Sequence, residues 1–276
     1  MAADAAPAPA PAPEPFKLET VEEQKESGYW TVLLFGAPGA GKTSLAGTFP
    51  RPLFIDTDLK TLTLRSKWFK EWFKADAPAF VRQFTEDTDE NGLFIEAKAF
   101  LEATRFINRA MSKAADQFDT IVVDSLTTTQ GLAMNLGLEL AQRRERSKTM
   151  QEARRAGGIP VPLATQADYG AEMAVFEQFV SQLVALPKHI VCTAHEREQT
   201  NNKGQILSVD PYLIGSRIRS LIGAWFEEIW HLDTDNHHNR ILTTQSDHQK
   251  KCIQTRHGVP NGLVNPTFPR ILEVSR

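Results

Sequence analysis

The stretch GAPGAGKTS, Gly36 to Ser44, has the composition and spacing of a loop that binds phosphate. It satisfies the pattern GxxxxGK[ST] with Gly36, Gly41, Lys42 and Thr43, and it directly follows the apolar run WTVLLF. Glycines let backbone N–H groups surround an anion without interference from a Cβ atom. We therefore expect this loop to bind the phosphates of ATP or GTP.

The side chains of the loop have separate expected roles. Lys42 should reach the β and γ phosphates, and the hydroxyl of Thr43 should bind Mg²⁺ together with phosphate oxygens and waters. An ordinary glycine-rich turn is the alternative, which the preceding strand disfavours. The full predicted nucleotide-binding set is Gly36, Pro38, Gly39, Ala40, Gly41, Lys42, Thr43 and Ser44.

A P-loop needs a second carboxylate at the end of a neighbouring apolar strand. Asp124 ends the run TIVVD and is placed for this role, so Thr43 and Asp124 are the predicted metal residues. A turn aspartate that merely ends a strand is the alternative interpretation. Because the chain contains no NKxD stretch, the motif that reads guanine, ATP is favoured over GTP.

The elements that must position these residues alternate between strand and helix. Apolar runs ending in glycine or aspartate predict buried parallel strands, and apolar spacing of three and four predicts helices. The predicted strands are 29–35, 53–56, 120–124 and 188–194, and the predicted helices that follow the second and third of them are 97–115 and 171–186. This alternation predicts an α/β fold with a mainly parallel sheet flanked by helices.

The two ends of the chain differ from this core. Residues 1–27 are an Ala/Pro repeat followed by acidic polar sequence, which predicts a disordered tether, and residues 28–276 are predicted to form one core. Near the C-terminus, the segments 224–232, 240–245 and 251–255 have strand-like patterns joined by polar turns. We expect them to extend one edge of the sheet in antiparallel fashion.

Composition sets further bounds. The formal charge of −3 over 276 residues gives no general attraction to nucleic acid, so a DNA-binding surface would have to be local. The two cysteines, Cys192 and Cys252, lie in apolar contexts typical of reduced thiols, which favours a cytoplasmic location. No apolar run approaches the roughly 20 residues of a membrane helix, so no membrane association is expected.

Taken together, residues 29–272 resemble the RecA-type recombinase core, and more narrowly the small phage ATPases that consist of that core alone and act as single-strand annealing recombinases. The resemblance implies a RecA-like P-loop NTPase fold and Mg²⁺-dependent hydrolysis of ATP. It also implies a homo-oligomer, either ring or filament, located in the host cytoplasm if a phage encodes the chain. Full activity would then require oligomerisation.

The resemblance implies roles for residues outside the loop. In FIDTD, Asp58 matches the position that polarises the attacking water, with Asp56 in reserve, although the family carries a glutamate there. Asp124 matches the Walker B carboxylate. His195, in the segment CTAHE, occupies the position of a γ-phosphate sensor, with a solvated histidine at a strand end as the alternative.

A further role falls on Arg256. The segment QTRHG, residues 254–258, resembles a KxR segment whose basic residues reach the nucleotide of the neighbouring subunit. Arg256 would then be an arginine finger supplied in trans. Gln254 replaces the expected lysine, and Lys250 or Lys251 could substitute for it or lie in a solvated turn.

The same resemblance predicts two mobile DNA-binding loops, residues 142–168 and 196–210. Between Gln142 and Gly158, six basic and two acidic residues give a local charge of +4. Such a segment could bind along a phosphate backbone, and the alternative is a solvated helix with ion pairs between its own side chains. Arg197 and Lys203 are the basic residues at the start of the second loop. Neither loop has an aromatic platform apart from Tyr169 and, more distantly, Tyr212.

These observations predict an ATPase, stimulated by DNA, that binds single-stranded DNA as an oligomer and promotes annealing or strand pairing. A single-strand-binding protein is a possible further partner. The alternative is an ATP-dependent switch or loader, or a helicase-like motor, that recruits replication or packaging proteins. The aromatic and basic cluster at residues 68–74 favours a packed amphipathic helix over a nucleic-acid surface.

Overall fold

The structure is a computed structural model. It describes residues 28–67, 69–70, 79–88, 94–144, 166–250 and 252–275. The predicted N-terminal tether and most of the first predicted DNA-binding loop lie outside these residues, as does most of the cluster at 68–74. Within that cluster, Phe69 is buried in the core, as a packed amphipathic helix would require.

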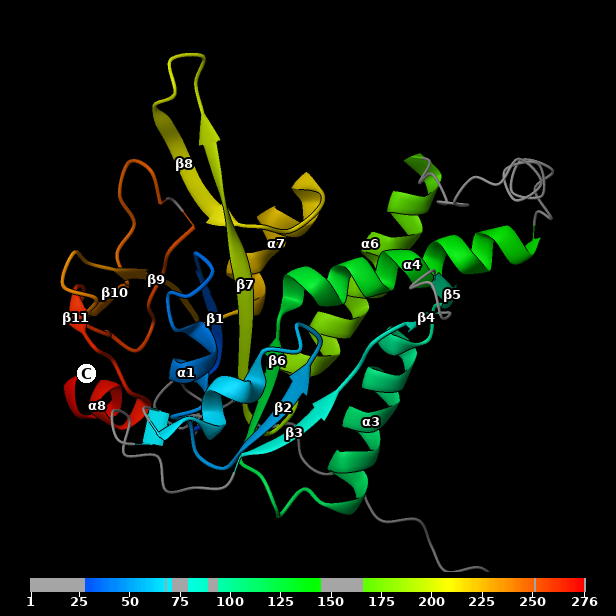
Figure 1. The fold of residues 1–276 in the computed structure, drawn as a ribbon, viewed down its shortest axis with the longest axis horizontal. Coiled ribbons are helices and arrows are strands. Elements are labelled where there is room, and N and C mark those ends of the chain that lie inside the picture. The colour runs from blue at the N-terminus through cyan, green and yellow to red at the C-terminus, as the bar shows by residue number, and fades with distance from the viewer. Residues whose placement is uncertain are drawn as a thin grey trace, which may run out of the picture.

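A nine-stranded sheet forms the centre of the molecule (Figure 1). Its parallel strands are, in spatial order, β9 (Glu228–Thr234), β1 (Thr31–Gly36), β7 (His189–Thr200), β6 (Thr120–Asp124), β2 (Pro52–Asp56) and β3 (Phe80–Gln83). Strands that are adjacent in space are therefore distant in sequence, as crossover connections require. The predicted α/β fold with a mainly parallel sheet is confirmed.

Antiparallel strands extend the sheet beyond β9. β10 (Arg240–Thr243) pairs with β9, and β11 (Leu263–Val264) pairs with β10, which confirms the extension predicted at the C-terminal edge. Three parts of that prediction were wrong. β9, which begins in the first of the three predicted segments, pairs with β1 in parallel and not in antiparallel fashion. The helix α7 (Ser216–Trp225) reaches into the segment predicted as the first of these strands, and only Gln254 of the segment 251–255 makes a β-bridge, to Ile229.

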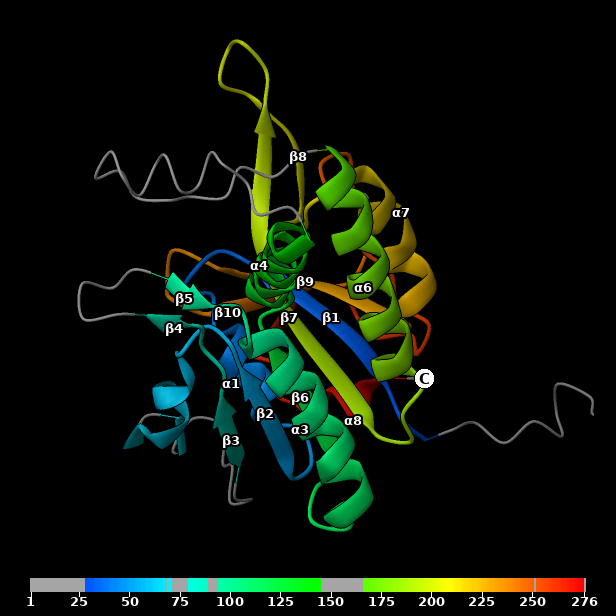
Figure 2. The same cartoon turned by 90° about the vertical axis from the view of Figure 1, so that its right-hand side faces the viewer.

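Helices cover both faces of the sheet (Figure 2). On one face lie α7 and the helices α3 (Ala99–Lys113), α4 (Leu126–Arg144) and α6 (Gln166–Val184). On the other lie α1 (Lys42–Ala46), the 3₁₀ helix η1 (Thr61–Arg65) and α8 (Phe268–Val274). A separate ribbon pairs β4 (Asp87–Thr88) with β5 (Phe94–Glu96). No helix in the described part of the chain is long and apolar enough to cross a membrane.

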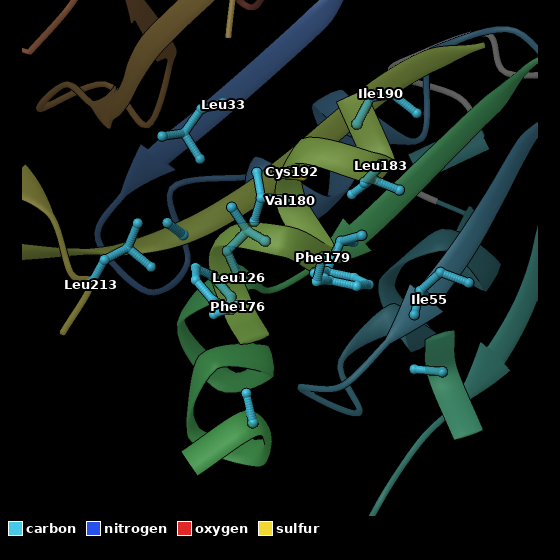
Figure 3. Packing of buried hydrophobic residues seen from close by; sticks show 14 of the residues in the cluster. Leu33, Ile55, Leu126, Phe176, Phe179, Val180, Leu183, Ile190, Cys192 and Leu213 are labelled. Carbon is cyan, nitrogen blue, oxygen red and sulfur yellow. The ribbon is translucent and has the colours of Figure 1, made fainter. Parts of the chain in front are cut away.

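The unbroken apolar runs of the parallel strands follow from this two-sided burial. In β1, Leu33 and Phe35 face the core shared with α6, whereas Val32 and Leu34 face the core shared with α1. Figure 3 shows part of the first of these cores, which contains Leu33 of β1, Cys192 of β7, and Phe176 and Val180 of α6. Because successive side chains of a strand point to opposite faces, both positions of the alternation must be apolar here.

The second predicted mobile loop is a β-hairpin. β7 continues beyond the core to Thr200, turns through residues 201–205 and returns as β8 (Ile206–Pro211). This hairpin stands out from the body of the molecule in Figure 1. The ends of the first predicted loop are helical, since α4 extends to Arg144 and α6 begins at Gln166. Residues 145–165 between them lie outside the described residues.

Candidate nucleotide-binding site

The predicted site residues come together at the carboxyl ends of the parallel strands. β1 ends at Gly36, which is level with His195 of β7, and Asp124 ends the neighbouring strand β6. A pocket of about 330 Å³ opens at this edge of the sheet, a size that suits a small-molecule ligand. Its lining comprises Pro38, Gly39, Gly41, Lys42, Thr43, Ser44, Asp58, Lys60, Thr63, Asp124, His195 and Arg240.

The P-loop backbone has a shape that only glycine permits at two positions. Gly41 precedes α1 with φ of 97°, in the left-handed region. A Cβ atom at Gly36 would collide with the carbonyl group of Leu232 in β9, so the close approach of the two strands excludes any side chain. Gly36 and Ala40, both predicted to contact nucleotide, do not line the pocket, and Ala40 is buried behind it.

The ammonium group of Lys42 is directed into the loop. Its Nζ donates to the carbonyl oxygens of Gly36 at 2.8 Å and Ala37 at 2.9 Å. Burial lowers the pKa of Lys42, whereas the nearby carboxylate of Asp124 acts in the opposite direction. A buried cation at this position gains by the approach of an anion, as the predicted phosphate-binding role requires.

The two predicted metal residues contact each other. The hydroxyl of Thr43 donates to Oδ2 of Asp124 at 2.7 Å, and the hydroxyl of Thr193 donates to Oδ1. Burial raises the pKa of Asp124, and these hydrogen bonds oppose the shift. A hydroxyl and a carboxylate beside a phosphate-binding loop are oxygen donors of the kind Mg²⁺ prefers, so the residues fit the predicted ion.

Asp58 lines the pocket, whereas Asp56 does not. Oδ1 of Asp58 accepts a hydrogen bond from Ser125 Oγ at 3.0 Å and another from the hydroxyl of Thr128. Oδ2 of Asp58 lies 3.1 Å from Nε2 of His195. The carboxylate of Asp56 is fully buried and accepts from Thr61 Oγ1 at 2.7 Å, which leaves Asp58 as the carboxylate able to face a nucleotide.

His195 lies within a strand and not at its end, which corrects the predicted position. Its backbone N–H donates to Thr127 Oγ1 at 3.0 Å, and its carbonyl oxygen accepts from the N–H of Tyr212 at 2.7 Å. The imidazole contacts Asp58 in the pocket while the strand continues into the hairpin. One strand therefore joins the pocket to the β7–β8 hairpin.

Arg256 lies outside the pocket of its own subunit. Its backbone N–H donates to Oε1 of Glu228 at 2.7 Å, and its side chain is exposed. Glu228 begins β9 and is level with Val32, near the start of β1, so Arg256 lies at the end of the sheet opposite the P-loop. The proposed action of Arg256 on a neighbouring subunit stays a prediction.

Three lining residues were missed in the sequence. Lys60 and Thr63 closely follow Asp58, and their place after the second strand was an available signal. Arg240 had no such signal, because it reaches the pocket from β10, in the antiparallel extension of the sheet. A Cβ atom on Gly41 would lie 2.6 Å from Cδ of Arg240, so the arginine side chain packs directly on the P-loop backbone.

The chain was compared with families of known proteins, with curated proteins and with solved structures. A family model described as an AAA domain matches residues 29–256. None of the functionally curated proteins compared with the chain matches it. Among solved structures, the flagellar accessory protein FlaH from Methanocaldococcus jannaschii is similar to 78% of this chain over 76% of its own length, with 14% identity and a TM-score of 0.35.

Proposed function

The chain belongs to the AAA domain family of P-loop ATPases, and we propose that it hydrolyses ATP while bound to single-stranded DNA as an oligomer, promoting annealing of complementary strands. The observation that carries the ATPase part is one pocket that combines the P-loop, the Thr43–Asp124 contact and the Asp58–His195 pair. These are the phosphate-binding, metal-binding and water-activating groups of a phosphoryl-transfer site.

The geometry supports the following proposed roles in hydrolysis. Lys42 replaces its hydrogen bonds to the carbonyl oxygens of the loop with hydrogen bonds to phosphate oxygens. Asp58 orients the attacking water and accepts its proton. Thr43 and Asp124 would hold Mg²⁺, which when bound would supply positive charge beside the phosphates. Arg256 lies too far from the pocket of its own subunit to reach a nucleotide there, so it would add its positive charge to the pocket of a neighbouring subunit. ATP turnover would then depend on oligomerisation.

The DNA-binding part of the proposal is supported by two features. The first is the basic segment 142–158, which begins at the end of α4. The second is the β7–β8 hairpin, which carries Arg197 and Lys203 as well as the exposed apolar side chains of Ile206 and Leu207. Basic groups that follow the phosphate backbone are one part of the usual combination for binding a single strand; the other part is aromatic side chains, and on this hairpin aliphatic side chains would meet the bases instead.

A binding titration tests this function. Anisotropy of a labelled single-stranded oligonucleotide is measured at two salt concentrations, with and without ATP, for the wild type and for a variant with Arg143, Arg144 and Arg146 changed to glutamate. If these three residues contact phosphates, affinity falls and the slope of log K against log salt becomes shallower by about 2. The matched control reverses Arg105, Arg109 and Lys113, which are exposed on α3 far from the hairpin.

The outcomes separate the alternatives. ATP-dependent binding that is lost in the first variant and kept in the control supports the proposal, and annealing is then followed by energy transfer between labelled complementary strands. Binding that is equal in both variants removes the basic segment from the proposal. A wild type that turns over ATP but binds no oligonucleotide favours a nucleotide switch that recruits a protein partner.

A further inference from the structure

A cation from outside the P-loop lies against it. Arg240 lines the same pocket as Lys42 and Thr43, although it belongs to β10. Its side chain follows the backbone of Gly41 so closely that a Cβ atom there would lie 2.6 Å from Cδ and 3.4 Å from Cζ of the arginine. The absence of a side chain at Gly41 therefore provides the room through which Arg240 reaches the nucleotide pocket.

The strand order defines the side from which Arg240 approaches. Asp58 follows β2, Asp124 ends β6 and His195 lies in β7, and these three strands lie on one side of β1. Arg240 belongs to β10, which is separated from β1 on the other side by β9. The γ phosphate of a bound nucleotide would face the side that holds Asp58 and Asp124, which would leave the rest of the phosphate chain on the side of Arg240.

The backbone of Arg240 is held in place within its own subunit. Its N–H donates to Oδ1 of Asn265 at 2.9 Å, and its carbonyl oxygen accepts from the N–H of Asn265 at 2.7 Å. The β9–β10 ladder also pairs Arg240 with Thr234. Partial burial lowers the pKa of the guanidinium, so an anion that approaches Arg240 would offset part of the cost of burying its charge.

We infer that Arg240 is a nucleotide-binding residue acting in cis, whose guanidinium binds the α or β phosphate from the side of the P-loop opposite Asp58 and Asp124. This inference rests on the proposed binding of nucleotide in the pocket. A planar guanidinium forms two parallel hydrogen bonds to phosphate oxygens, a geometry that a lysine cannot reproduce. Since ADP and ATP share these phosphates, Arg240 contributes to ground-state binding of both and not to the transition state alone.

Calorimetric titration of the full-length protein with Mg²⁺ tests the inference. The ligands are ADP, GDP and the β,γ-imido analogue of ATP, and the proteins are the wild type, Arg240→Ala and Arg240→Lys. Loss of a charge-assisted contact should weaken ADP and the ATP analogue by a similar factor of about 10 to 100, with Arg240→Lys in between. If GDP binds, Arg240→Ala should weaken it by the same factor, because the contact is to phosphate. Arg105→Ala, an exposed arginine of α3, is the control and should bind like the wild type.

Specific results would overturn the inference. ADP affinity of folded Arg240→Ala within twofold of the wild type excludes a contact with the α or β phosphate. Weakening of the ATP analogue alone assigns the contact to the γ phosphate, and weakening of ADP without GDP assigns it to the base. If Arg240→Ala does not fold, Arg240→Gln is measured against the same criteria. A wild type that binds no nucleotide refutes the proposed function as well, whereas normal binding by the variant refutes only the role of Arg240.

Discussion

Nε2 of His195 lies 3.1 Å from Oδ2 of Asp58, so the strand that forms the hairpin contacts the carboxylate that faces the nucleotide pocket. Ser125 and Thr128 donate to the other oxygen of the same carboxylate. Asp58 is therefore held by contacts to both of its carboxylate oxygens. This fixation distinguishes Asp58 from a surface aspartate and makes its removal informative.

Replacing Asp58 by asparagine should stop turnover without preventing binding. The amide keeps the size of the side chain but cannot accept a proton from water, so kcat should fall by about 100-fold or more while ATP affinity changes little. Steady-state hydrolysis and calorimetry measure the two effects. Asp56→Asn is the comparison: its carboxylate is buried against Thr61 and Gln83, so this change should lower the melting temperature instead. Unchanged turnover in Asp58→Asn would exclude it as the base.

Replacing Asp124 by asparagine should stabilise the nucleotide-free protein. Burial raises the pKa of Asp124, so the folded state favours the neutral acid and the ionised form costs stability at neutral pH. Each kcal/mol gained in the free energy of unfolding corresponds to a rise in melting temperature of about 2–4 °C. The gain should vanish below the ordinary carboxyl pKa of 3.8, where the group is protonated in both states. Mg²⁺-dependent hydrolysis should be lost.

The exposed carboxylate of Asp116 supplies the control for this experiment, and Asp116→Asn should leave the melting temperature unchanged. A lower melting temperature for Asp124→Asn at neutral pH would mean that the hydrogen bonds from Thr43 and Thr193 outweigh the cost of burying the charge.

Mixing two inactive variants tests whether Arg256 acts in trans. Lys42→Ala has a defective pocket and an intact Arg256, whereas Arg256→Ala has the reverse. In a random equimolar oligomer about a quarter of the interfaces should combine an intact pocket with an intact arginine, so ATPase activity should reappear. Mixing Lys42→Ala with Asp124→Asn places both defects in the pocket and should rescue nothing. Absence of activity at every ratio of Lys42→Ala to Arg256→Ala argues against the finger.

His189 should make the protein less stable in mild acid. Its Nδ1 accepts the N–H of Trp30 at 3.1 Å, and burial lowers its pKa from 6.5. The unfolded chain therefore binds a proton as the pH falls below 6.5 while the folded state resists, and stability drops. The free energy of unfolding should fall by less than about 1.4 kcal/mol per pH unit, the limit for uptake of one proton, because the ring of His189 is only half-buried. Urea unfolding at pH 7.5 and 5.5 measures it.

Because other groups titrate in the same pH range, the effect of His189 is measured by comparing wild type and His189→Asn in how much the free energy of unfolding changes with pH. His189→Asn can keep the acceptor for Trp30 but does not titrate there, so its unfolding free energy should fall less between the two pH values. Parallel loss in both proteins would assign the acid sensitivity to other residues.

The parts of the site that could be predicted from the sequence are those encoded by neighbouring residues. Thr43 and Lys42 are fixed by the spacing of the loop, and Asp124 by an apolar run that ends in a carboxylate. Because parallel strands end at one edge of a sheet, such local signals also predict that these residues meet.

The parts that could not be predicted depend on strand pairing. Arg240 reaches the pocket only because β9 lies beside β1 and β10 beside β9, an order that no local pattern specifies. The segment 251–255 alternates like a strand, yet the carboxylate of Glu228 binds Thr255 Oγ1 and the N–H of Arg256, which replaces a ladder by side-chain hydrogen bonds. The polar sequence after His195 resembled a loop because a hairpin exposed on both faces has no apolar alternation to reveal it.

The continuity of β7 determines what kind of surface the hairpin presents. A loop could fit each ligand by separate rotations of its residues, at an entropic cost paid on binding. A paired strand anchored by the cross-strand bonds of the sheet keeps its reach and direction, so its tip is already shaped before any encounter. A ligand of the hairpin should therefore meet a rigid two-stranded ribbon, whose direction changes only when the whole hairpin moves as one body.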